Sequence, residues 1–80
     1  MPDWVREDEE VHCLSVRLGA AGGALRALVQ GLGGARWDWQ AWDERHRAPR
    51  RWGVVDTPER AKGEAERAMA DLMRQVDRVA

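Results

Sequence analysis

Eighty residues with 13 basic and 14 acidic side chains carry a formal net charge of −1, and 44% of them are hydrophobic. A chain this short forms one small domain, which excludes a two-lobed active-site cleft, a doubly wound nucleotide-binding sheet and a closed barrel. The near-zero charge argues against a protein that coats nucleic acid or an acidic membrane. The single cysteine excludes an internal disulfide and favours a reducing, cytoplasmic setting.

Residues 1–10 are an acidic segment with a net charge of −4, and we expect a partly flexible leader there, followed by one α+β domain over residues 11–80. This is the reverse of the basic start of a signal peptide, and the apolar runs of the chain are too short for a bilayer, so no membrane partner is expected. The acids are either a solvated tail or a second surface for a partner. They are Asp3, Glu7, Asp8, Glu9 and Glu10.

Residues 11–18 (VHCLSVRL) alternate between two faces, with His12, Leu14, Val16 and Leu18 on one of them. This period of two, with β-branched residues, predicts a strand. From residue 21 onward the apolar positions follow helical spacing (21, 24, 25, 28, 29 and 32), and glycines at 31, 33 and 34 supply a stop. We therefore expect a short helix over residues 22–32.

A tryptophan-rich segment over residues 35–43 (ARWDWQAWD) alternates again and predicts a second strand. The polar residues 44–51 (ERHRAPRR) contain a proline and predict a hairpin loop, after which residues 51–55 (RWGVV) return as a third strand. Gly53 lies in the middle of that strand, where it indicates a bulge or a close packing contact.

The last segment begins with Asp56, Thr57, Pro58 and Glu59, in which threonine suits the N-cap, proline the first helical position and glutamate the helix dipole. One apolar stripe then continues to the C-terminus and predicts an amphipathic helix of about 20 residues. The expected fold class is α+β in the order β-α-β-β-α, a three-stranded, mostly antiparallel sheet covered on one face by two helices. Its expected core is Leu14, Val16, Leu18, Trp37, Trp39, Val54, Met69, Leu72 and Val76.

Side chains that could perform chemistry are few. His12 and Cys13 are neighbours on a strand and leave opposite faces, and His46 lies among loop arginines. No pair of residues has the spacing of metal ligands. We therefore expect a protein that is not an enzyme and that uses no metal or cofactor.

The most informative cluster lies on the predicted hairpin and consists of Trp42, Arg45, His46, Arg47, Arg50, Arg51 and Trp52. Arginine and tryptophan are enriched at binding hot spots, so the cluster could hold an acidic protein surface. It could also bind phosphates and stack bases, or form a solvated loop with cation–π pairs. If Trp37 and Trp39 face the helices, Trp42 lies on the opposite, open sheet face, which could also receive a second copy of the chain in a homodimer.

Residues 36–69 (RWDWQAWDERHRAPRRWGVVDTPERAKGEAERAM) resemble the small orphan proteins of phages and mobile elements in GC-rich bacteria, among them the anti-CRISPR proteins. The resemblance implies a stoichiometric inhibitor that masks a surface of a host defence protein or nucleoprotein complex. The leading hypothesis is thus a small protein-binding module. The alternative is a nucleic-acid-binding accessory protein that uses the same hairpin.

Overall fold

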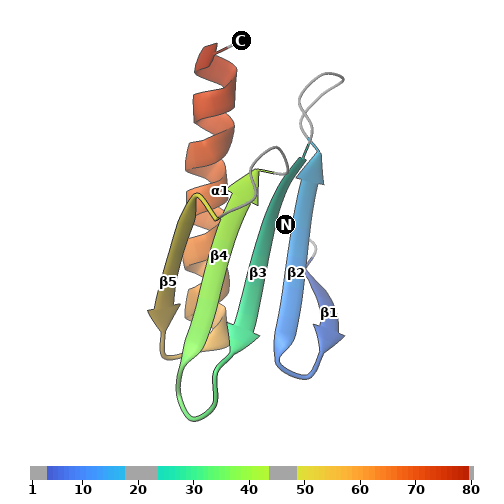
Figure 1. Cartoon of the computed structure of the whole chain (residues 1–80), viewed down its shortest axis with the longest axis vertical. Coiled ribbons are helices and arrows are strands. Elements are labelled where there is room, and N and C mark those ends of the chain that lie inside the picture. The colour runs from blue at the N-terminus through green and yellow to red at the C-terminus, as the bar shows by residue number, and fades with distance from the viewer. Residues whose placement is uncertain (1–3, 18–23, 44–48, 80) are drawn as a thin grey trace.

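The computed structural model describes residues 4–17, 24–43 and 49–79, with the backbone alone at residues 17 and 76–79. It contains one antiparallel sheet in which five strands lie in chain order, followed by one C-terminal helix (Figure 1). The elements are β1 (Val5–Asp8), β2 (Val11–Arg17), β3 (Ala24–Gly31), β4 (Trp37–Asp43), β5 (Arg51–Val55) and α1 (Pro58–Val79).

The predicted architecture is therefore wrong in two elements, although the α+β class is right. Over the described residues, the sheet has five strands where three were expected, and one helix covers it where two were expected. The predicted helix over residues 22–32 is strand β3, and the acidic leader contains strand β1. Every pairing in the sheet is antiparallel between strands that are neighbours in sequence, so the chain forms a simple meander.

Strand β3 is the central strand of the sheet, and this position explains why its sequence was misread. Leu25, Ala27 and Val29 are buried on one face, while Leu28 is half-buried on the other. A strand with apolar residues on both faces has no strict alternation, so its pattern also fits helical spacing. This eight-residue run follows Gly23 in the sequence and ends at Gly31, a length and punctuation typical of a buried strand.

Strand β1 is short and pairs with β2 through Val5 opposite Cys13 and Arg6 opposite His12, before a bulge shifts the register. The turn after β1 is joined to β3 as well, because the Gly31 amide donates to the Glu10 carbonyl at 2.8 Å. The leader is thereby tied into the sheet at residues 5–10.

Strands β4 and β5 form the hairpin predicted from the sequence, with Trp39 opposite Gly53. A Cβ added at Gly53 would lie 2.7 Å from Nε1 of Trp39, so the indole ring lies directly against the glycine. This confirms the predicted close packing contact. Val54, however, was wrongly placed in the core: it is 51% exposed, and Val55 packs against the core instead. The reason is the alternation, which turns Gly53 and Val55 toward the helix.

Helix α1 begins as predicted. The Thr57 hydroxyl accepts a hydrogen bond from the Arg60 amide at 3.1 Å, and the Thr57 carbonyl accepts one from Ala61 at 3.0 Å. Pro58 takes the first helical position. The buried stripe of the helix is Ala61, Ala65, Ala68, Met69 and Leu72. Its small residues allow the helix to approach the sheet closely.

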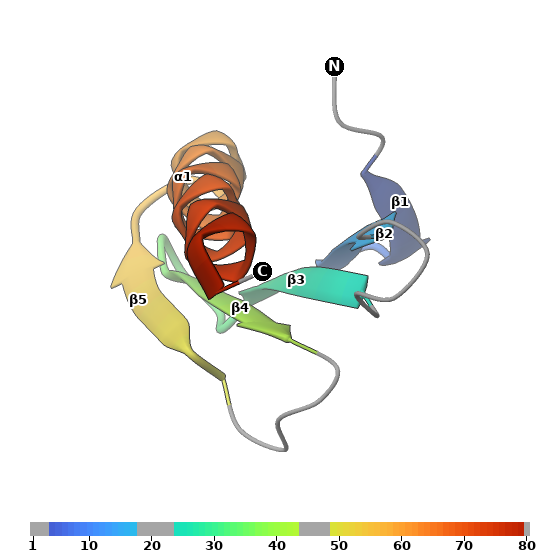
Figure 2. The same cartoon turned by 90° about the horizontal axis from the view of Figure 1, so that it is seen from above.

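The molecule thus has two layers, with α1 lying across β3, β4 and β5 on one face of the sheet (Figure 2). Trp4, just before β1, joins this layer from the side. Its Nε1 donates to Glu66 Oε1 at 3.1 Å, and the Lys62 ammonium lies 5.8 Å from its ring centroid. In the described part of the chain, no helix is long and apolar enough to cross a membrane.

Candidate docking surface on the open sheet face

The face of the sheet opposite α1, here called the open face, is not covered by any element within the described residues (Figure 2). Trp37 and Trp39 pack toward the helix, and because side chains alternate along a strand, Trp42 lies on the open face. This division of the tryptophans agrees with the alternation predicted from the sequence. On β5, Trp52 and Val54 share the open face and are 68% and 51% exposed.

The strand register arranges the open face in three rows that run across the strands. The central row is largely apolar and consists of Val5, Cys13, Leu28, Gln40 and Trp52. The arginine row, on one side of it, consists of Ser15, Arg26 and Trp42. The acidic row, on the other side, consists of Val11, Gln30, Asp38 and Val54.

Two charged groups give these rows opposite character. Arg26 is exposed and lies directly opposite Trp42 across β3 and β4. Asp38 is half-buried and accepts a hydrogen bond from Nε2 of Gln40 at 3.2 Å, which orients its carboxylate. Glu7 lies on β1 between Val5, which pairs with Cys13, and Asp8, which pairs with Val11, and its carboxylate interacts with the thiol of Cys13. The open face therefore carries a positive side and a negative side, separated by apolar side chains.

The predicted hairpin cluster is only partly on this face. Trp42 and Trp52 lie on it, whereas Arg51 points to the other side of the sheet and its guanidinium lies 3.6 Å from the Asp71 carboxylate of α1. Arg50 is exposed, and its amide donates to the Ala41 carbonyl at 2.9 Å. Arg45, His46 and Arg47 lie outside the described residues.

The acidic leader was predicted as a second candidate surface, and its members lie apart. Glu7 borders the open face as described, while Asp8 uses its carboxylate to accept a hydrogen bond from the Glu9 amide at 2.7 Å. Glu10 places its side chain against Gly31. Asp3 lies outside the described residues. The described acids are exposed, with no shared concave site that would hold a cation.

Two titratable groups on β2 are perturbed, one on each face. Burial raises the pKa of the Cys13 thiol, and the neighbouring Glu7 carboxylate raises it further. Cys13 is therefore a protonated, weakly nucleophilic thiol at neutral pH. His12, on the helix side, has its centroid 6.4 Å from that of Trp37, and burial together with Lys62 and Arg6 lowers its pKa.

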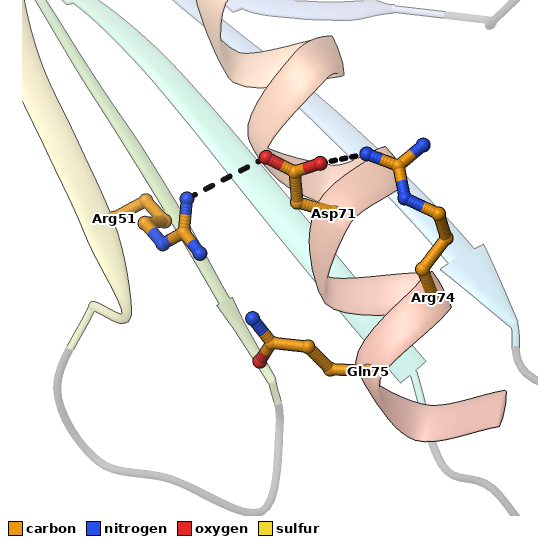
Figure 3. Close-up of a pocket in the computed structure, with 4 residues that line it drawn as sticks. All are labelled: Arg51, Asp71, Arg74 and Gln75. Atoms are coloured by element: carbon orange, nitrogen blue, oxygen red, sulfur yellow. Dashed lines mark hydrogen bonds and ion pairs between the residues drawn. The ribbon is translucent and has the colours of Figure 1, made fainter. Parts of the chain in front are cut away.

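A hollow of about 250 Å³ lies between β5 and α1 and is lined by Arg51, Asp71, Arg74 and Gln75 (Figure 3). Asp71 is held between two guanidinium groups, since both Arg51 and Arg74 pair with it. The hollow is a place where ion pairs tie the last strand to the helix. Its lining contains no histidine, cysteine or hydroxyl group that could act as a base or nucleophile.

Among the described residues, no three histidine, cysteine or acidic side chains gather as metal ligands. The open face offers contact area and charged side chains to a binding partner. The sequence reasoning missed Arg26 and Leu28 as members of this face, because it assigned them to a helix. The signal that could have found them is the eight-residue length of the glycine-flanked run.

Comparison of this chain with models of known protein families, with curated proteins and with solved structures gives no match.

Proposed function

We propose that this chain is a small, non-enzymatic protein-binding module that masks a surface of a host protein or nucleoprotein complex, as a phage or mobile-element inhibitor of the anti-CRISPR kind does. The observation that supports it best is Trp52, a large aromatic side chain left 68% exposed on a sheet face beside the half-buried Trp42. Tryptophan and arginine are enriched at binding hot spots, and Arg26 lies opposite Trp42 on the same face. The proposed docking residues are Trp42, Trp52 and Arg26.

A partner with an apolar patch bordered by acidic groups fits the Trp42 side of this face. Burying an indole removes a large apolar area from water, roughly 150–250 Å². Arg26 would form an ion pair with one of the partner's carboxylates beside that patch. Asp38 and Glu7 would repel the same acids and so orient the partner. The module would act by occupying a surface, one copy for each site blocked.

The test compares two equally simple surface changes in a capture experiment from host lysate. Trp52→Ser removes the exposed indole from the open face, while Leu32→Ser removes a 50%-exposed apolar side chain from the β3–β4 turn. We expect Trp52→Ser to lose the captured partner at least tenfold and Leu32→Ser to retain it. Equal capture by both variants would contradict the proposal.

The second candidate function is nucleic-acid binding by the same face. It rests on the cross-strand pair of Arg26 and Trp42, a phosphate-binding group beside a stacking surface. Such binding weakens steeply with salt, because phosphate contacts release counterions, whereas a packed protein interface is less sensitive. A mobility-shift titration at low and moderate salt separates the two. Retardation of RNA or DNA that disappears at moderate salt and in Arg26→Glu would favour this candidate.

A further inference from the structure

The charge pattern of the open face is complementary to itself. The arginine row and the acidic row lie on opposite sides of the central row. Each is two residues away from it along the strands. A surface that meets its own copy about a two-fold axis must be complementary to itself, since each contact occurs twice. A pattern of positive, apolar and negative rows satisfies that condition when the axis runs along the apolar row.

We propose that the open face pairs with the open face of a second copy, about a two-fold axis that lies along the central row and across the strands. The proposal deepens the proposed function and rests on it in taking this face as the docking surface. The second copy would cover the open face when no host partner is bound. Host binding then competes with self-pairing.

The proposed axis places each central row on itself and each arginine row over the acidic row of the other copy. Stacked sheets lie about 10 Å apart with strand directions within about 30° of each other. Arg26 on β3 of one copy would then reach the Asp38 carboxylate on β4 of the other copy. The two-fold axis makes this ion pair twice in the dimer. Trp52 and Leu28 would lose their contact with water.

A different two-fold axis, parallel to the strands, is disfavoured by the same charges. When this axis runs along β3, it places the arginine row over the arginine row and the acidic row over the acidic row, so that the two copies of Arg26 approach each other and neither faces an Asp38. Like charges brought together across an interface repel and oppose association. The position of Arg26 and Asp38 on opposite sides of the apolar row thus selects one arrangement.

Light scattering on the purified protein, from about 10 to 500 µM, gives the first test. We expect the mass to approach twice the 9.1 kDa of one chain. Arg26→Glu and Asp38→Arg, each made alone, should return the mass to that of a monomer, because each places like charges in contact. The double variant Arg26→Glu/Asp38→Arg restores opposite charges and should restore the dimer. Arg67→Glu, the same charge change on the exposed side of α1, is the matched control and should stay dimeric.

Circular dichroism on each variant shows whether it is folded, so that a lost dimer is not confused with a lost fold. A wild-type protein that remains monomeric at 500 µM would overturn the proposal. A dimer that survives both single charge changes, or that the double variant does not restore, would overturn it as well.

Cross-linking gives an independent measurement of the axis. Cys13 is the only cysteine of the chain and belongs to the central row, so the axis brings it opposite its own copy. Stacked sheets lie about 10 Å apart, and the two thiols point toward each other across that space, so a short bis-methanethiosulfonate reagent should produce a covalent dimer. The reaction is run near pH 8 for an extended time, because burial raises the pKa of this thiol and so slows its reaction. The folded Arg26→Glu variant should give little cross-linked product, and equal yields from both proteins would contradict the axis.

Failure of this inference is distinguishable from failure of the proposed function. The mass and cross-linking experiments use purified protein only, whereas the proposed function depends on Trp52-dependent capture from host lysate. Monomeric protein that still captures a host partner would overturn self-pairing alone. Dimeric protein whose capture does not depend on Trp52 would overturn the host-binding function alone.

Discussion

Gly53 shows how a single residue can decide the packing of two strands. The Trp39 indole lies over it, and an added Cβ would come within 2.7 Å of Nε1. Gly63, in α1, is different, because an added Cβ meets nothing within 4 Å. One glycine is required by a close approach, and the other only weakens a helix.

We therefore expect opposite effects from the same substitution at these two positions. Gly53→Ala should lower the free energy of unfolding by about 1–3 kcal/mol, since it forces the Trp39 ring out of its place. Gly63→Ala should raise it by about 0.5–1 kcal/mol, since alanine is the better helix former. Urea denaturation of both variants checks the signs, and a neutral Gly53→Ala would show that the indole moves without cost.

His12 should make folding depend on pH. Burial, Lys62 and Arg6 lower its pKa below the usual 6.5, with Glu59 acting weakly in the other direction. Between the folded and unfolded pKa values the unfolded chain binds more protons, so the free energy of unfolding falls as the pH falls below about 6.5. In His12→Gln this contribution should vanish. The measurement is the difference in unfolding free energy between the two proteins from pH 8 to pH 5, and a difference that stays constant would contradict it.

At the scale of elements, the sequence-based prediction was correct for α1 and wrong for β3. The helix has its start signal in four consecutive residues, and the structure places a hydrogen bond from the Arg60 amide on the Thr57 hydroxyl. Strand β3 has only the length of its apolar run as a local signal, and because its residues are apolar on both faces the same run also fits helical spacing. β2 and β4 pair with it over nearly its whole length.

The capping hydroxyl should contribute measurably to stability. Thr57→Ala removes the acceptor for the Arg60 amide and should cost about 1 kcal/mol. Thr57→Ser keeps a hydroxyl at the same position and is the matched control, for which we expect a change of a few tenths of a kcal/mol at most. Thermal unfolding followed by circular dichroism at 222 nm reports both, and equal losses in the two variants would show that the hydroxyl is not what matters.

At the scale of the whole molecule, one thin core lies between a sheet and a single helix. The buried residues come from β2, β3 and β4 on one side and from α1 on the other. A domain of this length has a total stability of about 4–12 kcal/mol. The loss of stability caused by a single cavity in this core is therefore a large fraction of the total stability.

Two neighbouring helix residues test this dependence. Leu72 is 3% exposed, and Leu72→Ala should cost about 2–5 kcal/mol through lost burial and a cavity. Met73 is 37% exposed, so Met73→Ala should cost less than about 1 kcal/mol. The comparison uses urea denaturation midpoints. Similar losses would mean that the helix does not close the core through Leu72.

The amino-acid sequence by itself determined the elements whose signals are local. Alternation predicted strands over residues 11–18 and 35–43, which the structure has at 11–17 and 37–43, and β-rich composition predicted the strand at 51–55. A proline, a capping threonine and an apolar stripe predicted the helix from residue 58. Alternation also placed Trp42 on the side opposite Trp37 and Trp39. These properties follow from backbone geometry of a few neighbouring residues, which any fold must respect.

Only the tertiary structure decided the rest. β3 is a strand because it lies between two others and is apolar on both faces, and β1 forms because β2 offers it a free edge. The tertiary structure also pairs Arg51 of the hairpin with Asp71 of a distant helix. It also brings Arg26 beside Trp42. Pairing between strands depends on what lies alongside in space, and a local pattern carries no information about that.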